Sequence, residues 1–155
     1  MSKCIFCQIA QNELPSYKIY EKDGFIAFLD INPNTFGATI VIPSKHISSS
    51  LIDIDYDTFK NTMIQAKKVA EHLAIKLKVQ KVGMAIEGTG VDHFHVKLYP
   101  FHQDKSLTEQ EQKEKSLNQK RVFNKYYKGY LTTQLGPQAD IKDLQQLAID
   151  LKIYC

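Results

Sequence analysis

Two kinds of hydrophobic periodicity occur along the first part of the chain, and together they predict a sheet with one long helix. Short runs rich in β-branched and aromatic residues, the composition typical of strands, occupy residues 17–20, 25–29, 38–42, 82–86 and 93–99. Asp23-Gly24 lies between the first two runs, and this dipeptide is a strong signal for a tight hairpin. Gly88-Thr89-Gly90 separates the last two runs and predicts another turn between strands.

A helical period begins at residue 55 and continues to residue 78. Its apolar positions recur at steps of three and four residues, which places them in one stripe: Tyr56, Phe59, Met63, Ala66, Ala70, Leu73 and Leu77. Such a stripe is typical of packing against a core rather than of a cofactor site. The order hairpin, strand, helix, strand, strand favours the α+β class, with a mostly antiparallel sheet and one long helix packed on a face.

The last third of the chain is expected to extend the same domain. Residues 106–125 are polar and charged and are predicted to form a loop followed by a helix, and residues 126–130 are rich in aromatic side chains. Asp140 can cap a final helix whose apolar side carries Ile141, Leu144, Leu147, Ala148 and Leu151. We therefore expect residues 1–100 to form the domain core and residues 101–155 to be its helical C-terminal extension.

Composition narrows the class of protein without indicating a reaction. The chain has 155 residues, of which 43% are apolar and 24% charged, as expected for one globular domain with its own core. A net charge of +3 is too small to indicate nucleic acid or a membrane surface as the main partner. The sequence has neither an apolar run long enough for a transmembrane helix nor a secretory signal, so a cytoplasmic location is expected.

The chemistry is concentrated in the last predicted strand. Residues two apart share a face of a strand, so His93, His95 and Lys97 are expected to point one way and the apolar residues between them the other way. Three basic groups in a row repel one another when all are charged, and an anion between them or a metal on the imidazoles removes that problem. An ordinary exposed polar face of a sheet is the alternative.

Two of the three cysteines form a Cys-x-x-Cys sequence, Cys4 to Cys7, and the third is Cys155. An odd number of cysteines without a secretion signal argues against a disulfide framework. A thioredoxin-like redox pair is one interpretation, but the surrounding sequence lacks the βαβ pattern that such a pair requires. Metal binding is the other interpretation.

Four short motifs, taken together, resemble the histidine-triad (HIT) family of nucleotide-binding proteins. They occur in the order and spacing of that family and cover roughly residues 4 to 100: Cys4-Ile5-Phe6-Cys7, Phe28-Leu29-Asp30-Ile31-Asn32-Pro33, Ile40-Val41-Ile42-Pro43-Ser44-Lys45-His46 and His93-x-His95. The resemblance implies an α+β protomer that usually forms a homodimer. It also implies hydrolysis or transfer at the α-phosphate of a small-molecule nucleotide through a covalent nucleotidyl-histidine.

The resemblance assigns roles to individual residues. His95 matches the nucleophile, the middle histidine of the family motif. The chemistry agrees, because attack by a neutral imidazole splits one difficult displacement at phosphorus into two easier ones. Asp30 matches the carboxylate that accepts hydrogen bonds from both ribose hydroxyls. The apolar positions that sandwich the base are matched by Ile5, Phe6, Ile9, Phe28 and Ile31. For these five residues, packing in the core is the alternative.

The resemblance also favours a structural zinc ion. Zinc-bearing HIT proteins carry both cysteines together with two histidines, and the matching residues here are Cys4, Cys7, His46 and His93. Two thiolates and two imidazoles form a common tetrahedral ligand set for zinc. Zinc at this position would tie the N-terminal segment to the sheet and would commit His46 and His93 as neutral ligands.

The chain departs from the family pattern at three places. Lys97 stands where the family has its third histidine; it is expected to stabilise charge on a phosphate, although a lysine can also extend into solvent. Glu87 lies beside a short glycine loop, where its charge is expected to repel phosphate. The extension after Pro100 lies outside the match and leaves the substrate open. A nucleotidyltransferase and a non-catalytic nucleotide sensor or scaffold therefore remain alternatives to a hydrolase.

Overall fold

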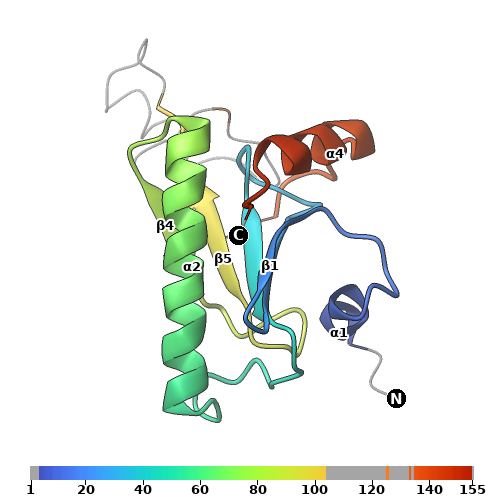
Figure 1. Ribbon diagram of the computed structural model, residues 1–155, viewed down its shortest axis with the longest axis vertical. Helices are drawn as coiled ribbons and strands as arrows, with labels where there is room; N and C mark the ends of the chain where they lie inside the picture. The colour runs from blue at the N-terminus through green and yellow to red at the C-terminus, as the bar shows by residue number, and fades with distance from the viewer. Residues whose placement is uncertain (1–3, 104–124, 126–132, 134, 155) are drawn as a thin grey trace.

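The computed structural model describes residues 4–103, 125, 133 and 135–154, and within them the α+β prediction is confirmed. Five strands form one antiparallel sheet in the order β1-β2-β3-β5-β4 (Figure 1). Their bounds are β1 Lys18–Lys22, β2 Phe25–Leu29, β3 Thr39–Pro43, β4 Val82–Ala85 and β5 Val96–Pro100. The helices are α1 Ile5–Ala10, α2 Tyr56–Leu77 and α4 Ile141–Asp150.

The predicted hairpin forms between β1 and β2. Asp23 and Gly24 both have positive φ, 54° and 79°, which is the backbone of the type I′ turn that matches the twist of a two-residue hairpin. Lys22 pairs with Phe25 directly across this turn. The strand predicted over residues 93–99 begins only at Val96, so His93 and His95 lie in the segment that leads into β5.

Helix α2 agrees with the helix predicted over residues 55–78 to within one residue at each end, and it covers one face of the sheet. Its first turn is capped by Asp55, which accepts a hydrogen bond from the Thr58 amide at 2.8 Å. Ala66, Val69 and Leu73 are fully buried against the sheet. Tyr56 belongs to the predicted stripe but is 94% exposed. A helix of 22 residues runs for about 33 Å and a five-residue strand for only about 17 Å, so the ends of α2 extend past the sheet.

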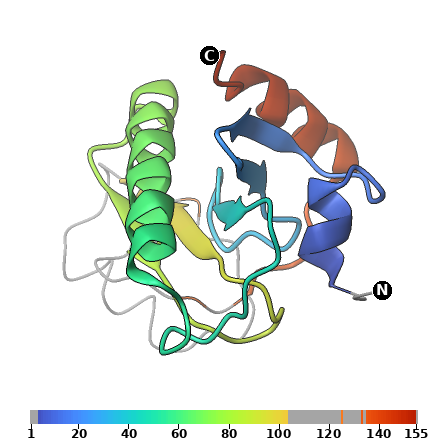
Figure 2. The same ribbon diagram turned by 60° about the horizontal axis from the view of Figure 1, so that its bottom comes forward.

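A short helix that the sequence did not predict, α1, covers the opposite face (Figure 2). Its buried residues Phe6 and Ile9 pack in a second core cluster with Ile26, Phe28, Ile40 and Ile42. The spacing of Phe6 and Ile9 suits a helix, but six residues are too few to give a periodic signal, and Cys4 provides no side-chain cap.

The predicted C-terminal helix is confirmed as α4, and it adds to the core beneath α2. Asp140 caps it by accepting hydrogen bonds from the Lys142 and Asp143 amides. Ile141 is 57% exposed, whereas the other four predicted apolar residues are buried: Leu144, Leu147, Ala148 and Leu151. After the helix, the Ile153 amide donates to the Ile19 carbonyl at 2.8 Å, so this end of the chain is fastened to β1. The loop, helix and aromatic run expected at residues 106–130 lie outside the described residues, apart from Lys125.

Within the described part of the chain, β1 and β4 are the two edge strands of the sheet, and β4 is partly open to solvent. Its residue Met84 is 40% exposed. The expected homodimer would cover such an edge, and it remains a prediction. None of the helices in the described ranges is both long enough and apolar enough to cross a membrane.

Candidate functional site

The two cysteines and two histidines with metal-ligand chemistry meet at one end of the sheet. Cys4 and Cys7 come from the start of α1, His46 follows β3, and His93 precedes β5. The Sγ atoms of Cys4 and Cys7 lie 3.4 and 3.5 Å from His93 Nδ1, and Cys7 Sγ lies 3.4 Å from His46 Nδ1. One ligand atom from each of the four residues lies within 4.8 Å of the others.

These distances fit a tetrahedral zinc site. Zinc bonds of about 2.3 Å to sulfur and about 2.0–2.1 Å to nitrogen place neighbouring ligand atoms about 3.3–3.8 Å apart. His93 Nε2 donates a hydrogen bond to the Pro43 carbonyl at 2.9 Å, which leaves the lone pair of Nδ1 facing the two sulfurs. The four residues are therefore compatible with zinc in number, chemistry and spacing.

The segments that carry His46 and His93 are joined by their own hydrogen bonds. The Phe94 amide donates to the Ile47 carbonyl at 2.8 Å. Asp92 Oδ1 accepts from the Ser49 amide at 2.8 Å and from the Ser48 hydroxyl at 3.1 Å. One backbone hydrogen bond and two hydrogen bonds to the Asp92 side chain therefore hold the two segments together.

His95 lies next to this cluster and is fixed in one orientation. It is 3% exposed and His93 is fully buried, so the alternative of an ordinary exposed polar face does not hold for these two residues. His95 Nδ1 lies 2.7 Å from the His93 carbonyl oxygen, and because a carbonyl only accepts, Nδ1 must carry the proton. In the neutral ring, Nε2 then holds a free electron pair. The Phe6 ring packs edge-on against both imidazoles, with centroids 5.9 Å from His93 and 5.4 Å from His95.

The surroundings of His95 favour the neutral ring. Burial is the main cause that lowers the pKa of His95, and the positive charge of Lys97 lowers it further. The hydrogen bond to the His93 carbonyl and the charges of Glu87 and Asp30 oppose this shift without reversing it.

Lys97 forms an ion pair with Glu87, with Nζ and Oε2 separated by 3.0 Å. Burial raises the pKa of Glu87, but hydrogen bonds from Thr133 and Lys97 and the charge of Lys97 outweigh it, so the pKa is lowered overall. The repulsion between Glu87 and phosphate that the sequence predicted is therefore offset by its partner. Lys97 lies on the α1 side of the sheet, because it pairs with Ile40 of that core cluster.

Asp30 follows β2 and is almost completely buried. Its Oδ1 accepts a hydrogen bond from the Asn32 amide at 2.8 Å, which fixes the carboxylate in a turn. The residues predicted to hold the base divide into two groups. Phe6, Ile9 and Phe28 are core residues, whereas Ile5 and Ile31 are 44% and 48% exposed and have surface available for a ligand.

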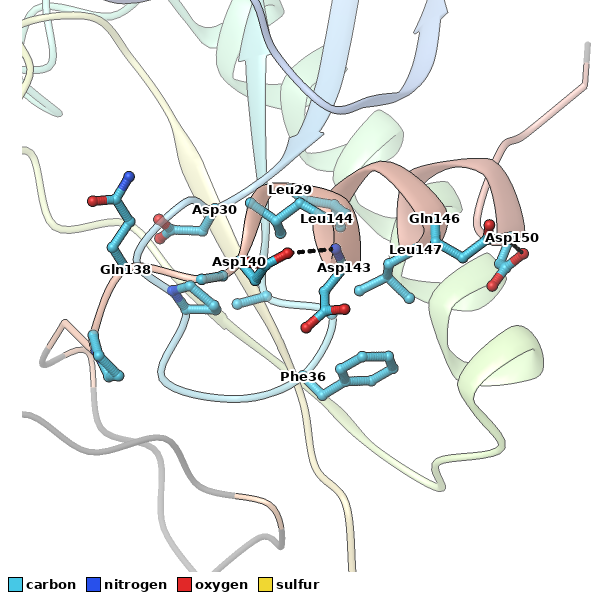
Figure 3. Close-up of a pocket in the computed structure, with 15 residues that line it drawn as sticks. Leu29, Asp30, Phe36, Gln138, Asp140, Asp143, Leu144, Gln146, Leu147 and Asp150 are labelled. Carbon is cyan, nitrogen blue, oxygen red and sulfur yellow. Dashed lines mark hydrogen bonds between the residues drawn. The ribbon is translucent and has the colours of Figure 1, made fainter.

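A cavity of about 440 Å³ lies between the Asp30 turn and α4 (Figure 3). Buried apolar residues of β2 and α4 form part of its wall, and four carboxylates line it, from Asp30, Asp140, Asp143 and Asp150. Its lining does not include His95 or Lys97. The segment before α4 is bound to the same turn, since the Gly136 amide donates to the Asn32 carbonyl and a side chain at Gly136 would meet the Pro33 carbonyl at 1.9 Å. The extension thus shapes the surroundings of Asp30.

Three further polar side chains lie in positions that the sequence motifs do not mark. The ring of His72 is half-buried, and its Nε2 lies 3.0 Å from the Leu151 carbonyl. His102 Nε2 lies 2.9 Å from the Phe36 carbonyl. Tyr99 is 4% exposed on β5, two residues beyond Lys97. The strand period of two was the available signal that Tyr99 shares the face of Lys97.

Comparisons with known proteins agree with this architecture. Residues 3–115 match the family described as "Scavenger mRNA decapping enzyme C-term binding". An uncharacterised HIT-like protein of Borreliella burgdorferi is 51% identical over 74 residues, which are 47% of this chain and 52% of the relative. The adenosine 5′-monophosphoramidase HNT1 of Saccharomyces cerevisiae is 38% identical over 106 residues, 66% of this chain and 65% of that enzyme. The match therefore spans between about half and two thirds of these relatives.

A solved structure gives the same fold over almost the whole chain. The zinc-bound histidine triad family protein of Mycobacterium smegmatis superposes with a TM-score of 0.66 at 21% identity, covering 96% of this chain and 93% of the other. The family match, the sequence relatives and the fold all agree, and the chain belongs to the histidine-triad family.

Proposed function

We propose that this protein is a nucleotide hydrolase in which His95 Nε2 attacks the α-phosphate. The observation that carries the proposal is the 2.7 Å contact between His95 Nδ1 and the His93 carbonyl, which directs the free electron pair to Nε2. A yeast relative is named as an adenosine 5′-monophosphoramidase, which supports a nucleoside phosphoramidate as the substrate class.

The reaction divides into two balanced displacements. His95 Nε2 forms a bond to phosphorus while the bond from phosphorus to the leaving amine breaks, and the amine takes up a proton from solvent. The ring keeps its Nδ1 proton throughout and is cationic while it carries the nucleotidyl group. A water molecule then attacks phosphorus, releases one proton and frees neutral His95. The products are the nucleoside monophosphate and the amine.

Three groups are proposed to hold the nucleotide around His95. Asp30 would accept hydrogen bonds from the ribose hydroxyls, since Oδ1 is already fixed by the turn. The exposed side chains of Ile5 and Ile31 would contact the base, while Phe6, Ile9 and Phe28 support them from the core. Lys97 would hold a phosphate oxygen, because an ammonium has three donors and the contact with Glu87 occupies one of them.

We also propose zinc at the Cys4, Cys7, His46 and His93 cluster. The ligand distances and the Pro43 bond to His93 support it, and a zinc-bound protein of the same fold is known. Bound zinc would supply structural cross-linking between α1 and the sheet. His93 in particular would then be fixed by its side chain while its carbonyl orients His95.

A substrate panel tests the hydrolase proposal. With adenosine phosphoramidate as substrate, the parent should release adenosine monophosphate without an added acceptor. His95→Asn should lose roughly 10⁴-fold or more in kcat, as expected for loss of a nucleophile, and should still bind the monophosphate. Product that forms only with an added acceptor would indicate a transferase. Binding without turnover of any nucleotide conjugate would indicate a sensor or scaffold.

Metal content gives an independent prediction. Protein purified without added metal or chelator should contain about one zinc per chain by elemental analysis. Cys4→Ser should lose this metal, and Cys155→Ser is the matched control that should retain it. Removal of the metal by a chelator should lower the thermal midpoint, because the site joins α1 to the sheet. Metal-free parent protein, or equal zinc content in both variants, would refute the site.

The Lys97–Glu87 pair gives a prediction about charge. Lys97→Met keeps the length of the side chain, removes its charge and leaves Glu87 facing the phosphate, so kcat should fall by about 10²–10³. Glu87→Gln should lose far less, since the phosphate then gains a fully available cation. The double variant should recover part of the loss if repulsion by Glu87 contributes to it. Parent-like turnover of Lys97→Met would show that Lys97 has no part in the reaction.

A further inference from the structure

Tyr99 carries a buried hydroxyl group for which the described residues offer no acceptor. The side chain is 4% exposed, and its oxygen has no hydrogen-bond partner in the part of the chain that the structure describes. Burying a hydroxyl without a partner costs free energy, so such a group in a folded protein requires an explanation. The contacts of Tyr99 with the described residues do not provide one.

The position of Tyr99 in the sheet places it on the face of the proposed nucleotide site. Along β5, Val96 and Leu98 belong to the core beneath α2, so Lys97 and Tyr99 belong to the opposite face. Tyr99 pairs with Gly83 on β4, which has no side chain to satisfy it.

On the other side, Tyr99 is in line with the proposed ribose carboxylate. Leu98 pairs with Thr39, and continuing this antiparallel register by one residue places Ala38 beside Tyr99. The Ala38 carbonyl in turn accepts from the Asp30 amide at 2.9 Å. Asp30 and Tyr99 therefore lie in one row across the sheet, with backbones two strand spacings or about 10 Å apart.

The hydroxyl is suited to donate rather than to ionise. Burial raises the pKa of Tyr99, and the negative charges of Glu87 and Asp30 raise it further, so the proton stays on the oxygen at neutral pH. A ligand oxygen in the space between Asp30, Lys97 and Tyr99 would supply the missing acceptor.

We propose that the Tyr99 hydroxyl donates a hydrogen bond to an oxygen of the sugar–phosphate part of the bound nucleotide, an inference that rests on the proposed function. Tyr99 is then a substrate-binding residue, one strand step beyond Lys97. A bound nucleotide would then satisfy a donor for which the described residues offer no acceptor. The proposal therefore predicts that the Tyr99 hydroxyl strengthens nucleotide binding and does not stabilise the protein in the absence of nucleotide.

Removing only the hydroxyl tests the proposal. In the full chain, Tyr99→Phe should weaken binding of adenosine monophosphate by about 3- to 10-fold, the usual effect of one lost hydrogen bond, as measured by calorimetry. The thermal midpoint of the ligand-free variant should equal or exceed that of the parent, because an unsatisfied donor has been removed. A purely structural tyrosine would show the reverse pattern.

Tyr20→Phe is the matched control. Tyr20 is also 4% exposed, but it lies in the core beneath α2 and its hydroxyl donates to Gln65 Oε1 at 2.7 Å. Removal of the Tyr20 hydroxyl should lower the thermal midpoint and leave the affinity for the nucleotide unchanged. The same titration with adenosine locates the acceptor: a loss shared by adenosine assigns it to the sugar, and a loss confined to the monophosphate assigns it to the phosphate.

Two results would overturn the inference in different ways. Unchanged affinity of Tyr99→Phe for a nucleotide that the parent binds, with or without a lower thermal midpoint, would show that the hydroxyl does not contact the ligand, while the proposed function would stand. Failure of the parent to bind any nucleoside monophosphate would refute the proposed function and this inference together.

Discussion

The geometry of the site depends on His93, because its ring is part of the cysteine–histidine cluster and its backbone carbonyl holds the ring of His95. Its ring faces the sulfurs of Cys4 and Cys7 through Nδ1, and Nε2 is held by the Pro43 carbonyl. Its own carbonyl accepts the hydrogen bond from His95. Whatever fixes the ring of His93 therefore also fixes the backbone atom that sets the orientation and tautomer of His95.

The sheet gathers the residues of the proposed nucleotide site on one face. The long helix α2 occupies one face, and the proposed site lies on the other face, where α1 packs against β2 and β3. On that face the strand period aligns Lys97 and Tyr99 along β5, and the pairing of β2, β3 and β5 places Asp30 across from them. The C-terminal extension completes the surroundings of Asp30 through α4 and the segment bound to its turn.

Sequence periodicity predicted the elements whose signals are long or chemically specific. Helix α2 has a 22-residue stripe and a capping aspartate, and the Asp23-Gly24 turn requires a backbone that few other dipeptides adopt. Helix α1 was missed because six residues contain less than two helical turns. The start of β5 was misplaced because alternation of side chains continues through His93 and His95, where the ladder hydrogen bonds have not yet begun.

The candidate site was predictable in its residues but not in its pairings. The family motifs brought out Cys4, Cys7, His46 and His93, and the structure places their ligand atoms together. The Glu87–Lys97 ion pair joins the segment after β4 to β5 through the length of its two side chains, and no local sequence pattern predicts such a contact. The unsatisfied hydroxyl of Tyr99 is a property of packing in three dimensions, so only coordinates could reveal it.

The central claim is that His95 becomes covalently nucleotidylated, and trapping that species tests it most directly. A single turnover of adenosine phosphoramidate, quenched in alkaline denaturant to preserve the phosphorus–nitrogen bond, should yield one peptide that carries the mass of an adenylyl group. Fragmentation should locate this group on His95, and the His95→Asn variant should yield none. An adduct on another residue, or turnover at the parent rate without any adduct under conditions that preserve it, would contradict the account.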